Sequence, residues 1–88
     1  MPSILREAEL ATVLLSEQAA SAGKLIGELR LRTLTGASIV GIQRDGTSMV
    51  NPGPEEELRV GDEVLLLGSE EHLQAARDLL AKSQALSS

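Results

Sequence analysis

Hydrophobic and polar positions along this chain fall into short blocks with different periods. Short apolar runs that contain β-branched residues are typical of strands, and apolar residues spaced three and four apart are typical of helices. The pattern predicts a strand over 11–17, a helix over 22–29, an extended stretch over 38–50, a buried strand over 63–68 and a helix over 70–82. Leu73, Ala76, Leu79 and Leu80 are expected to form the buried face of the last helix.

Several small residues mark where the predicted helices begin, end or pack. Ser21 is placed to cap the helix that follows it, and Ser69 is placed to cap the last helix. Gly27 lies inside the first helix, where glycine costs about 1 kcal/mol relative to alanine. Its presence there indicates close packing against a neighbouring backbone. Gly36 ends the segment, because glycine readily takes the left-handed conformation that closes a helix.

The extended stretch over 38–50 contains the strongest local signal in the sequence. Asp45-Gly46 separates two runs rich in β-formers, and a type I′ turn needs positive φ at both central residues. The stretch is therefore predicted to be a two-stranded hairpin. Residues 51–57 carry Pro52 and Pro54 and are predicted to form a loop, because proline cannot donate to a sheet ladder.

Together these elements give the order β-α-β-β-β-α and an α+β fold class. We expect a single small domain with one mixed sheet covered by two helices. Residues 1–9 are predicted to be an N-terminal connector or arm, residues 10–82 the domain, and residues 83–88 a flexible tail. One face of the sheet is expected to stay uncovered within the chain, and a second copy of the chain is the natural cover.

Composition narrows the class of function. The chain has 88 residues, a net charge of −5, no aromatic residue and no cysteine. A negative charge opposes phosphate-backbone binding, and single-strand binding depends on aromatic stacking. The lack of cysteine excludes disulfides and thiolate sites. Composition therefore favours a cytoplasmic binding or regulatory domain that is not an enzyme, with no nucleic-acid partner and no direct insertion into the membrane.

Four segments in this order resemble the TrkA C-terminal domain, also called the RCK C-terminal domain. The resemblance covers roughly residues 10–82. The segments are Gly23-Lys24-Leu25-Ile26-Gly27-Glu28-Leu29, Thr35-Gly36-Ala37-Ser38-Ile39-Val40-Gly41-Ile42-Gln43-Arg44-Asp45-Gly46, Asn51-Pro52-Gly53-Pro54 and Gly61-Asp62-Glu63-Val64-Leu65-Leu66-Leu67-Gly68.

The resemblance implies a regulatory domain that forms a homodimer on the cytosolic face of a potassium channel, a potassium uptake system or a cation/proton antiporter. Some family members bind cyclic di-AMP in a cleft between two subunits, so cyclic di-AMP or another nucleotide is the implied ligand. The Asn51-Pro52-Gly53-Pro54 segment and the long aliphatic last strand look most like the antiporter domains.

The resemblance also points to the hairpin and the loop after it as the ligand site. Ile42 and Pro52 offer apolar surface for bases, while Arg44 and Asn51 offer donors for phosphates. By this resemblance, a nucleotide-binding member is expected to carry a basic residue one position after the isoleucine. Here that position is Gln43, and Arg44 comes next on the other face of a regular strand.

Four other groups of residues are candidates for a functional role. Glu55-Glu56-Glu57 is either a divalent-cation site or, more in keeping with adjacent carboxylates on a loop, a solvated acidic rim. His72 is interpreted as a surface residue rather than a pH sensor. The basic stripe of Lys24, Arg30 and Arg32 is interpreted as a solvated face, with phosphate or acidic-partner contact as the alternative. Asp62 is expected to bond local backbone amides.

Three hypotheses remain at this point. In the first, the chain is a ligand-sensing domain that biases the gating of a cation channel or antiporter. In the second, it is a structural dimerisation module with an empty cleft. In the third, it is the effector domain of a transcription regulator whose DNA-binding domain lies elsewhere.

Overall fold

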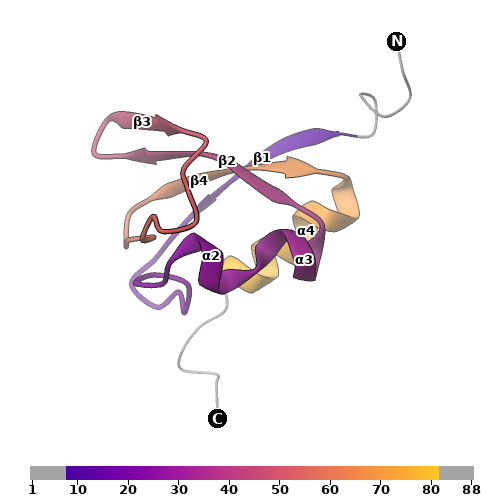
Figure 1. Cartoon of the computed structure of the whole chain (residues 1–88), viewed down its shortest axis with the longest axis horizontal. Helices are drawn as coiled ribbons and strands as arrows, with labels where there is room; N and C mark the ends of the chain where they lie inside the picture. The colour runs from indigo at the N-terminus through magenta and orange to yellow at the C-terminus, as the bar shows by residue number, and fades with distance from the viewer. Residues whose placement is uncertain (1–7, 82–88) are drawn as a thin grey trace.

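A computed structural model describes residues 8–81 as one sheet with helices on one side (Figure 1). The strands are β1 (Glu9–Leu14), β2 (Ser38–Arg44), β3 (Thr47–Val50) and β4 (Glu63–Gly68). The helices are α2 (Ile26–Leu29), α3 (Leu31–Thr35) and α4 (Glu70–Ala81). Helices α2 and α3 together occupy the place of the first predicted helix. The α+β class and the element order are confirmed.

The sheet is antiparallel throughout, so the expectation of a mixed sheet is wrong. Its strand order is β1-β4-β2-β3, and every pair of neighbours is antiparallel. Strands β1 and β2 do run in the same direction, because each of them is antiparallel to β4. However, β4 lies between them, so these two strands never pair.

The first helix begins later than predicted and is broken in two. Backbone N–H groups of Gly23, Ile26 and Gly27 donate to carbonyls of the 54–58 loop, at 2.7, 2.9 and 2.8 Å. These long-range bonds replace the first helical turn, so α2 starts at Ile26 instead of residue 22. Arg30 then adopts a left-handed conformation with φ 49°, which ends α2 before α3 starts at Leu31.

The first strand and its neighbouring serine also differ from expectation. The strand covers Glu9–Leu14 rather than 11–17, because its six residues pair in register with the six residues of β4. Ser21 does not cap the next helix. Its hydroxyl donates a buried hydrogen bond of 2.7 Å to the Leu80 carbonyl of α4. Residues 1–7 and 82–88 lie outside the described residues, and with them most of the predicted N-terminal connector, the last position of the predicted 70–82 helix and the predicted tail.

The predictions that rested on strong local signals are confirmed. Asp45 and Gly46 have φ values of 50° and 78° and form the tight turn between β2 and β3. Gly36 closes α3 with φ 85°. A Cβ at Gly27 would lie 3.1 Å from the Pro54 carbonyl oxygen, which explains the absence of a side chain there. The Ser69 hydroxyl accepts the His72 N–H at 3.3 Å, as an N-cap does.

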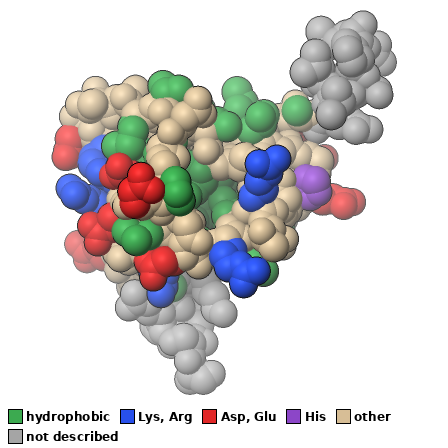
Figure 2. Space-filling model, viewed as in Figure 1, with side chains coloured by type: hydrophobic (Ala, Val, Ile, Leu, Met, Phe, Trp, Pro, Cys, Tyr) green, Lys and Arg blue, Asp and Glu red, His purple; other side chains and the backbone are tan. Residues whose placement is uncertain are grey.

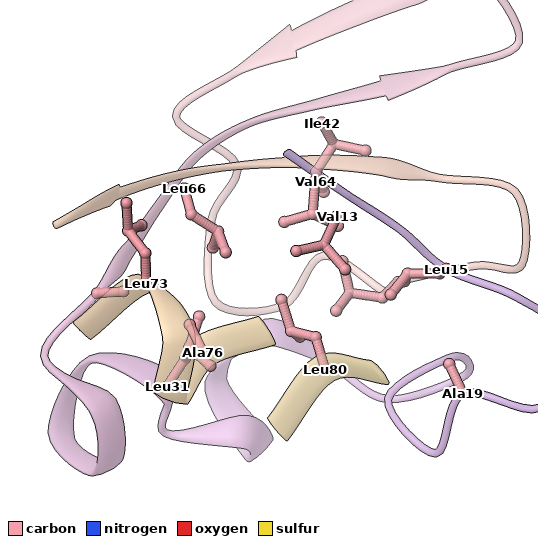
Figure 3. Packing of buried hydrophobic residues seen from close by; sticks show 12 residues of the cluster. Val13, Leu15, Ala19, Leu31, Ile42, Val64, Leu66, Leu73, Ala76 and Leu80 are labelled. Carbon is pink, nitrogen blue, oxygen red and sulfur yellow. The ribbon is translucent and has the colours of Figure 1, made fainter. Parts of the chain in front are cut away.

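The hydrophobic core lies between the helices and the face of the sheet that they cover, here called the inner face. Val13, Ile42, Val64 and Leu66 project from three strands toward the helices (Figure 3). Leu31, Leu73, Ala76 and Leu80 meet them from α3 and α4. With no aromatic residue in the chain, this aliphatic layer is thin. The predicted buried face of the last helix is confirmed, with Leu79 partly buried at its margin.

The opposite face of the sheet, here called the outer face, has no helix over it within residues 8–81 (Figure 1). Its strands nevertheless present large apolar side chains. Leu10, Leu14, Val50 and Leu67 are 63%, 68%, 77% and 37% exposed. Leu65 lies among them, partly buried. The expectation of an uncovered face is therefore met.

Candidate functional site

The candidate site is built on β2, whose regular alternation is interrupted once. The pairing of β2 with β4 shifts register between Ile39 and Gly41, which leaves Val40 as an extra residue in a β-bulge. Ile39 and Ile42 therefore both pair with inner-face residues of β4. The bulge resets the alternation, so that Gln43 points to the outer face and Arg44 to the inner side.

A pocket of about 360 Å³ lies on the outer face beside the hairpin. Its wall is mostly apolar, with a few polar side chains at its margin. It is lined by Thr12, Val40, Gly41, Ile42, Gln43, Ser48, Met49, Val50, Glu63 and Leu65. Small-ligand sites are typically mostly apolar with a small number of polar groups, and this pocket fits that description.

Arg44 is held by several partners inside the chain. Its Nε donates to Asp62 Oδ1 at 2.8 Å and its Nη2 donates to Asp62 Oδ2 at 2.7 Å. Nη1 donates to Glu56 Oε2 at 3.2 Å, and Nη2 also donates to the Glu57 carbonyl at 2.8 Å. A bidentate arginine–carboxylate pair is strong and geometrically specific. Arg44 therefore ties the end of β2 to the 56–62 segment.

The electrostatics of this pair favour the charged forms of both groups. Burial of Asp62, whose side chain is 1% exposed, would raise its pKa. The hydrogen bonds from the Arg44 side chain and the Arg59 N–H, with the charges of both arginines, outweigh burial and lower the pKa of Asp62 below its usual value. The hydrogen bond with Asp62 likewise raises the pKa of Arg44 above its usual value, against the effect of burial.

The structure places the predicted ligand residues in two groups. Ile42 and Gln43 line the outer-face pocket, Ile42 with only 2% of its surface exposed. Arg44, Asn51 and Pro52 do not line it. Asn51 follows β3 with φ 50°, and its N–H donates to the Val40 carbonyl at 3.0 Å, beside the bulge. Asn51 is exposed and directly follows the pocket residue Val50, and Pro52 after it is half-buried.

The acidic loop residues are partly engaged with arginines. Glu56 pairs with Arg44 at 3.2 Å, and Glu57 lies 3.7 Å from Arg59. Within residues 8–81, no group of three or more metal-ligating side chains is placed to hold an ion. Asp62 does accept a local backbone N–H, from Arg59 at 2.9 Å, as expected.

His72 and the basic stripe lie away from the hairpin. A Cβ at Gly36 would lie 2.8 Å from the His72 ring, so the ring packs against the end of α3. Arg30 and Arg32 border a different pocket, and Lys24 does not line that pocket.

Sequence reasoning missed the Arg44–Asp62 pair and the bulge at Val40. The two charged residues are separated by 18 positions, and no local pattern links them. The sequence did contain one signal. Asp62 comes directly before a buried strand, at a place where a charged side chain needs a partner.

A family model described as the TrkA-C domain matches residues 10–81 of the chain. The chain is 33% identical over 76 residues to a probable potassium channel protein 2 of Methanocaldococcus jannaschii, covering 86% of this chain and 22% of that protein. The chain thus spans about a fifth of that relative.

Two solved structures extend the comparison. The RCK_C domain dimer of S. agalactiae BusR in complex with c-di-AMP is 33% identical, with a TM-score of 0.74 and coverage of 80% of this chain and 92% of that chain. The GsuK channel bound to NAD is 33% identical, with a TM-score of 0.71 and coverage of 83% of this chain and 14% of that chain. BusR is also solved in complex with its busA-promotor DNA, where this chain covers 37% of the BusR chain. None of the helices in residues 8–81 is long and apolar enough to cross a membrane.

Proposed function

Because this chain belongs to the TrkA-C domain family, we propose that it is a cytoplasmic regulatory domain that pairs with a second copy of itself through the outer face of the sheet. We propose further that it senses a nucleotide at this dimer interface, here called the seam. The observation that carries the proposal is the uncovered apolar outer face with a ligand-sized pocket beside the hairpin. Two such faces in contact would remove both apolar surfaces from water, which is the main driving force of association.

The ligand that fits this seam is an adenine nucleotide of the cyclic di-AMP type. A relative with 33% identity is described as an RCK_C domain dimer with c-di-AMP. In the proposed site, Pro52 and the pocket residues Val50 and Leu65 contribute apolar surface. Ile42 lies in the pocket wall, but its side chain belongs to the core. The side-chain amides of Gln43 and Asn51 contribute donors for phosphate oxygens. Arg44 already donates four hydrogen bonds inside the chain. We therefore assign it the role of fixing the hairpin beside the ligand.

The partner of the domain is a membrane-embedded cation channel or antiporter. A probable potassium channel protein is among its relatives, which supports this choice. A ligand changes a gating equilibrium only by as much as its affinity differs between the two states. The dimer seam is a suitable place for such a difference, because any change in the angle between the two copies alters the pocket.

A second candidate is the effector domain of a transcription regulator. The BusR complex with promotor DNA favours it, since this chain matches 37% of that protein. In that case a separate domain contacts the DNA, because this chain carries a net charge of −5. The two candidates share the ligand site and differ in the attached domain.

The dimer is tested by sedimentation of the 88-residue chain at high micromolar concentration. Leu14→Glu places a charge on the outer face, whereas Leu34→Glu places one on α3, and both leucines have similar exposure, 68% and 63%. We expect a dimer for the unaltered chain and for Leu34→Glu. For Leu14→Glu we expect a dimer dissociation constant at least tenfold higher. A monomeric unaltered chain would refute the dimer seam.

The ligand is tested by titration calorimetry with cyclic di-AMP. We expect one nucleotide per dimer and an affinity about tenfold weaker in Gln43→Ala, because a hydrogen bond to a charged group contributes about 1.5–3 kcal/mol. Gln18→Ala, on an exposed turn, is the matched control and is expected to bind normally. Absence of heat with a dimer still present would favour the purely structural dimerisation module.

A further inference from the structure

A second pocket, of about 310 Å³, lies where α2 and α3 meet the beginning of β2. It shares no lining residue with the pocket beside the hairpin. Strand β3 pairs only with Gly41–Arg44, so the first residues of β2 have no strand on that side. The pocket occupies this open edge, with Ile26 and Ile39 as apolar wall residues.

Arg30 and Arg32 both line this pocket, together with the hydroxyl-bearing residues Thr33 and Ser38. None of its described lining residues is acidic. Neither arginine forms an ion pair with any acidic side chain in residues 8–81. Figure 2 shows blue side chains around a hollow next to α3, with green at its floor and most of the red side chains elsewhere. Positive charge is therefore concentrated here in a chain whose net charge is −5.

The break between α2 and α3 brings the two arginines to one pocket. Residues two apart on a continuous helix do not face each other. Arg30, however, has φ 49° and ψ 39°, and the chain changes direction there before α3 starts at Leu31. A residue other than glycine in this conformation carries a conformational cost, and such outliers gather at functional sites.

We propose that this pocket is a phosphate-binding site for a small phosphorylated molecule, separate from the nucleotide seam. The two guanidinium groups would hold the phosphate oxygens, since arginine presents paired donors that match phosphate geometry. The hydroxyls of Thr33 and Ser38 supply further donors. Ile26 and Ile39 supply an apolar wall for the body of the ligand. The site is complete within one chain and does not depend on the dimer.

The test is NMR titration of the ¹⁵N-labelled 88-residue chain with three probes: orthophosphate, adenosine monophosphate and phosphatidylglycerol vesicles. Shifts that saturate at residues 26–39 are expected with adenosine monophosphate, and weaker ones with orthophosphate. Shifts at residues 40–51 report the nucleotide seam instead, so failure of either site is seen separately. Binding to the vesicles alone would overturn the assignment to a small molecule.

Two variants test the arginines. Arg32→Ala keeps a good helix former, and Arg30→Asn keeps a residue that tolerates the left-handed conformation. Each is expected to weaken adenosine monophosphate binding by about tenfold, as loss of a hydrogen bond to a charged group does. Arg77→Ala, on the exposed face of α4, is the matched control and is expected to change nothing. Unchanged affinity in both pocket variants, or no shifts at residues 26–39 with adenosine monophosphate, would refute the site.

Discussion

The two faces of the sheet carry similar aliphatic side chains but have opposite surroundings. On the inner face Val64 and Leu66 are fully buried under the helices, whereas on the outer face Leu67, their neighbour on the same strand, is 37% exposed. Helices on one side account for the inner face. No helix within residues 8–81 covers the outer face, and exposed apolar patches of this kind are typical of interaction sites, which agrees with the proposed dimer.

The largest difference in stability between the two faces is expected when two adjacent leucines, one on each face, are replaced by alanine. Leu66→Ala removes side-chain atoms from a closed core and is expected to lower the free energy of unfolding by about 3–5 kcal/mol. Leu67→Ala is expected to lower it by about 1 kcal/mol or less at a concentration of about 1 µM, because its side chain already touches water in one chain.

Urea unfolding of both variants at low and at high concentration measures this contrast. If the outer face is the dimer seam, the effect of Leu67→Ala grows with concentration and that of Leu66→Ala changes little. Equal effects of the two variants at low concentration would mean that the faces do not differ as described.

A smaller effect is expected from the charged pair at the inner side of the hairpin. Arg44→Met keeps much of the side-chain volume but leaves Asp62, which is 1% exposed, without its bidentate partner. Loss of one member of a buried pair typically costs about 3 kcal/mol. Thermal unfolding measures the loss. Gln43→Met, one position away on the outer face, is the control and is expected to have little effect on stability.

The smallest effect on stability is expected from lowering the pH. The pKa of Asp62 is lower in the folded chain than in the unfolded chain. As pH falls, the unfolded chain therefore takes up this proton first, and stability decreases. The contribution of Asp62 is complete above its unfolded pKa of about 3.9 and is lost as pH falls through the lower folded value.

Urea unfolding from pH 6 to pH 2 measures this slope, and Asp62→Asn provides the comparison. The variant is less stable at pH 6, but its stability is expected to fall less steeply below pH 4. A slope identical to that of the unaltered chain would show that Asp62 does not titrate differently in the two states.

The fold could be predicted where a few adjacent residues decide the structure. Asp45 and Gly46 specify their turn through backbone freedom alone, and Ser69 specifies the start of α4 through one hydrogen bond. The start of α2 could not be predicted in this way. The N–H groups of Gly23, Ile26 and Gly27, just before and at the start of α2, bond to the 54–58 loop, about thirty residues further along the chain.

In the candidate site too, features decided by adjacent residues could be predicted from the sequence, and features decided by distant residues could not. Alternation along a strand predicts that Gln43 and Arg44 face opposite ways, but the bulge at Val40 decides which of them faces outward. That bulge depends on pairing with β4, which is distant in sequence. The partners of Arg44 are distant too, so sequence alone assigned it to a ligand, while the structure shows it bonded to Asp62 and Glu56.

The position of β4 has a consequence for how the chain folds. It is the last strand in sequence, followed only by α4, yet it lies between β1 and β2 in the sheet and pairs with both. The hairpin is able to form early from local contacts, but β1 has no strand beside it until Glu63–Gly68 arrives. Folding of the sheet is therefore expected to be completed late, in one step, when the last strand enters between two that are already present.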